Sequence, residues 1–408
     1  MMVKRSGQAS ARRLALTGLL CVVLSLVSGL PAHAATAWTI VPSPNASVVP
    51  LSNNMLTGVS TLAADDAWAV GAWTTTAITT GHSLIEHWNG GAWSVAPSPS
   101  VPGVTTALTA VSAHTRDDVW AVGTVTSGAA AIAQTLIEHW NGQQWSIVPS
   151  PNPSTQGCYF TGVAAIAADD VWAAGWFLTQ NQGALLPLLE HWNGQTWQVV
   201  APPVASGSII VNSIAAVSST DIWIVGMDET SGNSRTFIAH WDGQRWSRVP
   251  SPSLGSGPTE LFSVVALSGT DAWAVGEFTA VAPPGFAPPR ALVEHWDGQR
   301  WGTVLTPLAF GGESHLYGLT ALSPSDLWAV GSRVVASSGT LHTLTTHWNG
   351  STWSTAPSPQ RGFKGNENNV LFAAAAVSPS TIWAVGTWIS LEQGNPGNRT
   401  LILQTTQG

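Results

Sequence analysis

The chain has 408 residues, a formal net charge of −8, only 9% charged residues and 23 tryptophans. Because 22 Asp and Glu outnumber 14 Lys and Arg, the chain repels polyanions, which argues against nucleic acid and anionic membranes as partners. The tryptophans indicate a large buried aromatic area for a protein of this size.

The first 34 residues have the parts of a secretory signal peptide. Its basic residues are Lys4, Arg5, Arg12 and Arg13, its apolar stretch runs from Leu14 to Leu30, and Ala32-His33-Ala34 fits a small-residue cleavage site. The alternative is a membrane anchor, which the short apolar stretch disfavours. Cleavage leaves residues 35–408 with 10 basic and 22 acidic residues, a net charge of −12. Cys158 is then the single remaining cysteine, so an intrachain disulfide is excluded.

Three tryptophan phrases recur along the rest of the chain with a period of 49 to 55 residues. The first phrase, Asp-x-Trp-(Ala/Ile)-(Val/Ala)-Gly, has its tryptophan at Trp68, Trp120, Trp172, Trp223, Trp273, Trp328 and Trp383. The second, Leu-Ile-Glu-His-Trp-Asn-Gly or a variant, has Trp88, Trp140, Trp192, Trp241, Trp296 and Trp348. The third, Trp-Ser-x-Val-Pro-Ser-Pro or a variant, begins at Trp38, Trp93, Trp145, Trp197, Trp246, Trp301 and Trp353. A fixed period of this length indicates a repeat architecture.

Each repeat reads as four short β-strands. In the first repeat the predicted strands are Met55–Leu62, Ala67–Trp73, Ser83–Trp88 and Ala92–Ala96. Asn89-Gly90 fits a tight hairpin turn that needs a positive φ, and Pro97-Ser98-Pro99 ends the pairing. No helical periodicity appears after the signal peptide. Seven repeats of four antiparallel strands predict an all-β, seven-bladed β-propeller.

The third phrase at Trp38 is displaced, because it precedes the first full repeat. The last repeat, about residues 370–408, supplies only three strands before the chain ends. We therefore predict that the strand Ala37–Val41 is the fourth strand of that last blade and closes the ring, which removes open sheet edges.

The order of motifs within one repeat is also informative. The second repeat contains Val119-Trp120-Ala121-Val122-Gly123, then Glu138-His139-Trp140-Asn141-Gly142 and Trp145, then Pro149-Ser150-Pro151. This order resembles the repeat of the kelch and galactose-oxidase-like β-propellers, and the resemblance covers all seven repeats. The repeat of this chain differs from the family's repeat in having one glycine instead of two, and in having Trp where the family usually has Tyr. The copper chemistry of galactose oxidase is not implied, because the chain has only two tyrosines, Tyr159 and Tyr317, and Cys158 adjoins Tyr159.

An Asp and a His recur in six repeats. The pairs are Asp66 and His87, Asp118 and His139, Asp170 and His191, Asp221 and His240, Asp271 and His295, and Asp326 and His347. Such a set resembles a metal or catalytic site, but a site occurs once and these residues occur in nearly every blade. We predict instead that each pair belongs to a buried hydrogen-bond network that supports the fold.

The connections that differ between repeats follow the second and the fourth strand, and in a propeller these lie on one face. Binding residues concentrate on such variable loops. The candidate ligand-binding residues there are Trp73, Tyr159, Trp176, Glu260, Phe278, His315, Tyr317, Lys364 and Trp388. Aromatic side chains beside carboxylates suit sugar rings. The alternative is that these aromatics only fill gaps between blades.

No nucleophile elbow, phosphate loop, zinc-ligand spacing or HExxH motif occurs. We therefore expect neither metal nor cofactor, and a secreted or cell-surface monomer that binds a glycan or an extracellular protein without catalysis. One alternative is a carbohydrate-active enzyme, hydrolase or lyase, with acidic residues such as Glu260 and Glu313 at the channel mouth. Another is a structural cell-surface protein.

Overall fold

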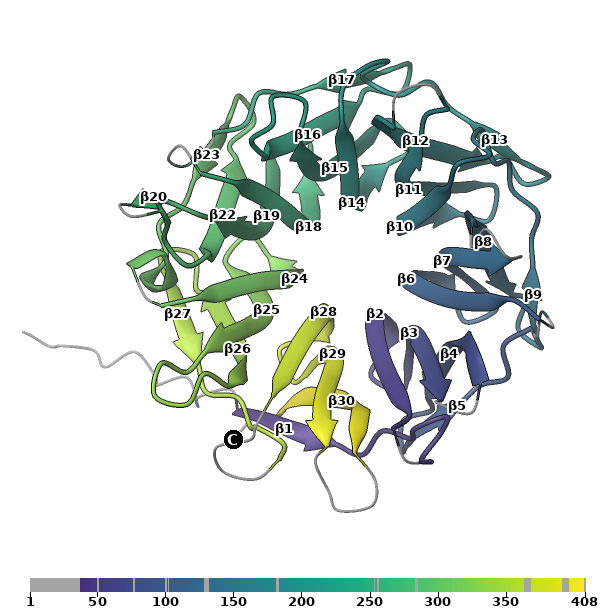
Figure 1. Ribbon diagram of the computed structural model, residues 1–408, viewed down its shortest axis with the longest axis horizontal. Helices are drawn as coiled ribbons and strands as arrows, with labels where there is room; N and C mark the ends of the chain where they lie inside the picture. Colours follow the sequence, from purple (N-terminus) through teal and green to yellow (C-terminus); the bar gives the residue numbers. More distant parts are fainter. Residues whose placement is uncertain are drawn as a thin grey trace, which may run out of the picture. The chain divides into compact units, whose positions relative to one another are not determined.

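Seven four-stranded antiparallel sheets, the blades, follow one another around a central cavity (Figure 1). The computed structural model describes residues 37–49, 51–75, 78–99, 101, 103–127, 132–180, 183–252, 254, 257–282, 285–310, 312–362, 368–390 and 396–406. In each blade the first strand lies innermost (Figure 1). The predicted all-β propeller is therefore confirmed.

The strands have the following bounds. Blade 1 contains β2 (Asn53–Ala63), β3 (Asp66–Thr75), β4 (Ile78–Trp88) and β5 (Trp93–Val95); blade 2 contains β6 (Thr105–Thr115), β7 (Asp118–Ser127), β8 (Ile132–Trp140) and β9 (Trp145–Ile147). Blade 3 contains β10 (Cys158–Ala167), β11 (Asp170–Leu178), β12 (Leu185–Trp192) and β13 (Trp197–Val199); blade 4 contains β14 (Ile209–Ser218), β15 (Asp221–Asp228), β16 (Arg235–Trp241) and β17 (Trp246–Arg248). Blade 5 contains β18 (Thr259–Ser268), β19 (Asp271–Phe278), β22 (Arg290–Trp296) and β23 (Trp301–Thr303), with the small hairpin β20 (Val281–Ala282) and β21 (Gly285–Phe286) between β19 and β22. Blade 6 contains β24 (Ser314–Ser323), β25 (Asp326–Val334), β26 (Leu341–Trp348) and β27 (Trp353–Ala356); blade 7 contains β28 (Asn369–Ser378), β29 (Thr381–Ser390), β30 (Gly397–Thr406) and β1 (Ala37–Val41).

Blade 7 is assembled from both ends of the propeller. Strand β1 pairs antiparallel with β30, with Trp38 opposite Thr405 and Ile40 opposite Leu403. The sheet order is β1-β30-β29-β28, so the N-terminal strand occupies the outermost position that β5 holds in blade 1 (Figure 1).

The strand ends differ from the sequence-based bounds. The third strand of blade 1 begins at Ile78 rather than Ser83, because Thr75 pairs with Ile78 and the hairpin of β3 and β4 extends further. The fourth strand is shorter than predicted and ends at Val95, although the Ala96 amide still donates to the Ile85 carbonyl at 2.9 Å. One short 3-10 helix, Pro307–Phe310, lies between blades 5 and 6. Within the described ranges, no helix has the length and apolarity to cross a membrane.

The tryptophans pack at the interfaces between blades. The third-phrase Trp of each blade meets the core Trp of the preceding blade edge to face, with ring centroids 5.1–6.0 Å apart and interplanar angles of 69–85°. Trp145 packs on Trp68 in this way, and Trp38 of β1 packs on Trp328 of blade 6. Pairs of this geometry contribute about 0.5–1.5 kcal/mol beyond the area they bury. The contact made by Trp38 therefore places β1 in the same ring of interactions as the other outer strands.

The glycine that ends the first phrase allows close approach of the inner strand. A Cβ on Gly71 would lie 1.9 Å from the Met55 carbonyl oxygen, and Gly331 meets the His315 carbonyl in the same way. At this level the inner strand has an irregular register, between Leu56 and Gly58 in blade 1. Any side chain here would force the two strands apart.

The recurring His and Asp contact each other in all six blades that carry both. The His Nε2 lies 2.7–2.9 Å from an Asp Oδ1 in each pair. Each His sits opposite its core Trp across the two middle strands, as His87 does opposite Trp68, and the rings pack 4.1–4.6 Å apart. The His side chains remain 25–32% exposed. The network is thus partly rather than fully buried, because the rings lie near the turns of the blade.

We expect His191→Leu to lower the free energy of unfolding by about 1–2 kcal/mol, because it removes the hydrogen bond to Asp170. Chemical denaturation of the purified protein measures this loss. If stability were unchanged and a ligand or metal were lost instead, the structural role would be contradicted.

Candidate functional site

The inner strands begin on the face that carries the variable connections. A strand that starts there ends at the opposite face, so the first residues of β18 and β24 lie at the mouth of the central cavity on the variable face. Glu260 is the second residue of β18, and His315 is the second residue of β24. Blades 5 and 6 are neighbours in the ring (Figure 1).

Three carboxylates and one imidazole meet at this mouth. Glu277 of β19 lies opposite Glu260 in the register of blade 5, and its Oε2 is hydrogen-bonded to Nδ1 of His315. The other ring nitrogen, Nε2, lies 3.5 Å from Oε1 of Glu313. Asn212 of the adjacent blade 4 donates its amide to Glu260 Oε1 at 2.8 Å. We call Glu260, Glu277, Glu313 and His315 the mouth cluster.

The environment shifts the pKa values of this group. Burial raises the pKa of Glu260 to about 7; the Asn212 hydrogen bond opposes this rise, and the charges of Glu277 and Glu229 add to it. Burial alone would lower the pKa of His315, but the hydrogen bond and charge of Glu277, helped by Glu313, outweigh it and raise that pKa. The imidazole is therefore favoured in its charged form, between two carboxylates.

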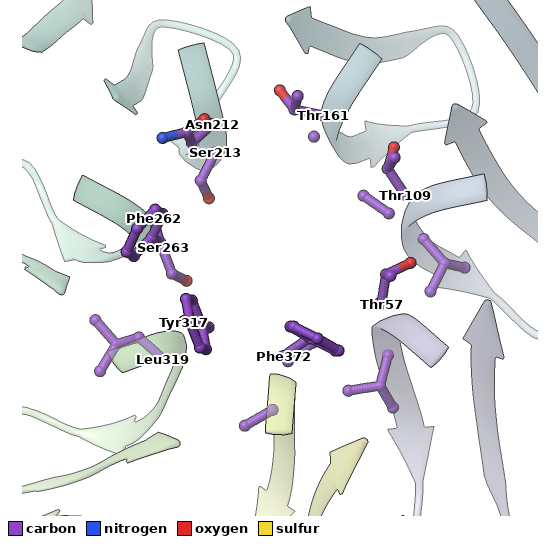
Figure 2. Close-up of a pocket in the computed structure, with 18 of the residues that line it drawn as sticks. Thr57, Thr109, Thr161, Asn212, Ser213, Phe262, Ser263, Tyr317, Leu319 and Phe372 are labelled. Atoms are coloured by element: carbon purple, nitrogen blue, oxygen red, sulfur yellow. The ribbon is translucent and has the colours of Figure 1, made fainter. Parts of the chain in front are cut away.

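A central cavity of about 210 Å³ lies within the ring of inner strands (Figure 2). Two of its lining residues contact the mouth cluster: Asn212 donates to Glu260, and the Tyr317 ring lies parallel to that of His315. Thr57, Thr109 and Thr161 line one side of it, Phe262, Tyr317 and Phe372 line another, and Asn212 lies between Thr161 and Phe262 (Figure 2). The Tyr317 ring lies 5.1 Å from Phe262 and is nearly parallel to the His315 ring, with a centroid separation of 5.6 Å. Burial, followed by the charge of Glu277, raises the pKa of Tyr317 to about 12, so its phenol stays neutral.

The threonines and Asn212 that line the cavity also have a structural role. Thr57, Thr109 and Thr161 each donate a hydrogen bond to a carbonyl of the next inner strand, at 3.0, 2.8 and 2.7 Å. Asn212 makes the equivalent contact to the Leu261 carbonyl at 2.8 Å. The equivalent residues of blades 5 to 7 are Phe262, Tyr317 and Phe372, and aromatic rings replace the bridging groups there. The lining therefore combines the hydroxyl groups of the threonines and of Ser213 and Ser263 with the aromatic rings of blades 5 to 7.

The structure brings together only part of the predicted ligand-binding set. Glu260, His315 and Tyr317 form one site. Tyr159 and Trp176 stack on each other in blade 3, 4.0 Å apart. Lys364 lies outside the described residues.

The remaining predicted aromatics lie elsewhere. Trp73 stacks on His82 in blade 1 at 4.6 Å. Trp388 of blade 7 is partly buried, and the Arg361 guanidinium lies 6.0 Å from its ring centroid. Phe278 is only 9% exposed and packs in the apolar core between blades 4 and 5, so it is a core residue rather than a rim residue.

The candidate ligand-binding residues did not include Asn212, Glu277 or Glu313, although Glu313 was considered with Glu260 for the enzyme alternative. A sequence signal was present for Asn212 and Glu277. Asn212 replaces the Thr of the first three blades, and Glu277 follows the glycine of the first phrase, where other blades have Ala, Thr, Trp, Met or Ser. Among the residues that the structure describes, no three His, Cys, Asp or Glu side chains are arranged to hold a metal ion.

No family model and no curated protein matches the sequence. Solved structures with the same fold do match. A structure of YCF48 bound to D1 peptide is 15% identical, with a TM-score of 0.53, and the match covers 91% of this chain and 97% of that one. An ulvan lyase of polysaccharide lyase family PL25, bound to a saccharide of GlcA and Rha3S, is 10% identical, with a TM-score of 0.52 and coverage of 90% and 94%. The polysaccharide lyase Uly1 is 9% identical, with a TM-score of 0.50 and coverage of 88% and 91%.

At these identities the likeness establishes the propeller fold and nothing finer. These matches are a peptide-bound YCF48 and two polysaccharide lyases, so they do not show membership of the kelch and galactose-oxidase-like family that the repeat resembles.

Proposed function

We propose that the chain is an exported binding module that recognises a glycan or an extracellular protein through the variable face of the propeller. The observation that carries this proposal is the mouth cluster, which lies beside a cavity with a hydroxyl side and an aromatic side. Apolar walls combined with a few convergent polar groups are the usual form of a ligand site. Structural neighbours that bind a peptide or a polysaccharide are compatible with it.

The net charge and the leader sequence are consistent with the same function. The mature chain is strongly acidic, which keeps it apart from polyanions, and the leader at residues 1–34 has the features of a signal peptide. We place the protein outside the cell, as a monomer without a cofactor.

We expect Tyr317→Ala to weaken ligand binding at least about tenfold, because it removes the ring that joins the mouth to the cavity. The measurement is a binding screen of residues 35–408 against glycans and peptides, followed by titration of each hit with the variant. Val199→Ala, on the outer strand of blade 3 and 47% exposed, is a matched control that should bind as the wild type does. A folded Tyr317→Ala protein with unchanged affinity would contradict the proposal.

A carbohydrate-active enzyme, hydrolase or lyase, is the second candidate. The observation that favours it is the Glu260 carboxyl, whose pKa of about 7 suits proton transfer near neutral pH. Product analysis after long incubation with each bound glycan distinguishes the two functions. Cleavage that Glu260→Gln abolishes would replace the binding proposal with the enzyme. Absence of binding to every member of the panel would favour a structural role.

A further inference from the structure

The mouth cluster also defines the chemical class of the ligand, and this inference rests on the proposed binding function. We infer that the mouth binds the ammonium group of an amino sugar, with the sugar ring held in the central cavity.

The charge balance of the mouth is the first argument. Glu277 and Glu313 both contact His315, so one imidazolium faces two carboxylates, and Glu260 is a third acidic group opposite Glu277. A ligand cation would balance the surplus negative charge, whereas a uronate or a sulfate would be repelled.

The cavity supplies the second argument. A pyranose ring has apolar C–H faces and a rim of hydroxyls, which match the aromatic side formed by Phe262, Tyr317 and Phe372 and the opposite threonine side. A lysine side chain could use the aromatic side and the carboxylates, but it has no hydroxyls to meet the threonines. A ring with both features therefore fits better than a basic peptide.

The fold does not require an acidic residue at the position of Glu260 or of Glu277. At the position of Glu260 the other blades have Met55, Ala107, Tyr159, Ile210, His315 and Val370. At the position of Glu277 they have Ala72, Thr124, Trp176, Met227, Ser332 and Thr387. Apolar and neutral residues thus suffice for the blade at both positions. Glu260 and Glu277 lie opposite each other in a single blade, and the charge of Glu277 adds to the rise in the pKa of Glu260; a bound cation would relieve this repulsion.

The test is a calorimetric titration of residues 35–408 with an oligomer of glucosamine and with its fully N-acetylated counterpart, at pH 6. We expect the amine oligomer to bind at least about tenfold more tightly than the acetylated one. Glu277→Gln and the more exposed Glu313→Gln should each weaken binding of the amine oligomer about tenfold. Because Glu313 is 39% exposed, its variant also tests the idea if Glu277→Gln does not fold.

Asp242→Asn is the control. It removes one negative charge from a turn on the opposite face, where Asn141 and Asn193 occupy the equivalent position and accept the same backbone hydrogen bonds. Its affinity should equal that of the wild type.

Equal affinity for both oligomers, or a loss of the same size in Asp242→Asn, would overturn the inference. So would binding of a lysine-rich peptide without binding of the amine oligomer. If neutral glycans bind and Tyr317→Ala abolishes that binding, the amino-sugar inference fails while the proposed function stands. If nothing binds, both fail.

Discussion

Replacing Trp38 by Ala is expected to lower the free energy of unfolding by about 3–5 kcal/mol, a loss typical of removing a buried tryptophan. Trp38 is 5% exposed, and it packs with Trp328, Leu371, Leu403 and other core residues at the interface of blades 6 and 7. It also lies on β1, whose pairing with β30 completes blade 7. The truncation thus weakens a blade interface and the attachment of the strand that closes the ring.

Urea denaturation of residues 35–408 measures this effect. Thr39→Ala is the matched control on the same strand, because Thr39 is exposed and its hydroxyl makes one hydrogen bond of 3.3 Å to the Gln404 carbonyl. The free energy of unfolding of the control should lie within about 0.5 kcal/mol of the wild-type value. If Trp38→Ala were equally stable, β1 would not be part of the closed ring.

The second large effect is a loss of stability as the pH rises from about 5 to above 8. Glu86, Glu138, Glu190 and Glu294 are fully buried on the third strands of their blades. Burial raises their pKa values to about 8, 7, 8 and 8, respectively. A folded-state pKa above the ordinary value of 4.5 means that the folded chain keeps protons which the unfolded chain releases. Stability from these groups is therefore fully present below about pH 4.5 and is lost as the pH rises through 8.

Three of these glutamates are linked to the preceding blade by a serine. Ser43 donates to Glu86 at 2.9 Å, Ser98 to Glu138 at 3.0 Å and Ser251 to Glu294 at 2.7 Å. The serine of blade 3 is replaced by Pro202, and blade 4 has Ala239 in place of the glutamate. The interface between blades 3 and 4 therefore lacks both partners of this link, whereas His240 and Asp221 of blade 4 remain paired.

Glu190 should show the largest individual effect, because neither of its carboxylate oxygens has a hydrogen-bond partner in the described structure. We expect Glu190→Gln to melt at a higher temperature than the wild type at pH 8.5, by an amount equivalent to a few kcal/mol, and to differ less at pH 5. Melting curves across this pH range measure the difference. Asp242→Asn should follow the wild-type pH profile, because the pKa of that exposed carboxyl is lowered and it titrates only in acid. A difference between Glu190→Gln and the wild type that does not grow with pH would contradict the account.

The fold was predictable because the same strand and turn motifs recur in each repeat. Seven core tryptophans fix the number of blades, and the displaced phrase at Trp38 predicts the pairing of β1 with the last blade. The ends of the strands were harder to predict, since a pairing such as Thr75 with Ile78 depends on the twist of a hairpin rather than on residue type. The His and Asp pairs were found because repetition separates structural from functional residues.

The site was only partly predictable. Glu260, His315 and Tyr317 were identified because they break the repeat at the start of an inner strand, and the structure places them at one mouth. The pairing of Glu277 with Glu260 could not be predicted from the sequence. The register of β18 and β19 has two irregularities, so counting residues back from the turn does not give the paired positions. Phe278 was wrongly predicted to lie at the rim for a related reason. Successive side chains of β19 face alternately the mouth and the core, so an error of one residue reverses the assignment.

The most direct test of the central claim is a crystal structure of residues 35–408 with the tightest ligand from the binding screen. The account predicts density at the mouth of the central cavity, with a polar group of the ligand within hydrogen-bond distance of Glu277 or Glu260 and an apolar face against Tyr317. A ligand bound on the opposite face, or on the outer strands away from blades 5 and 6, would contradict it.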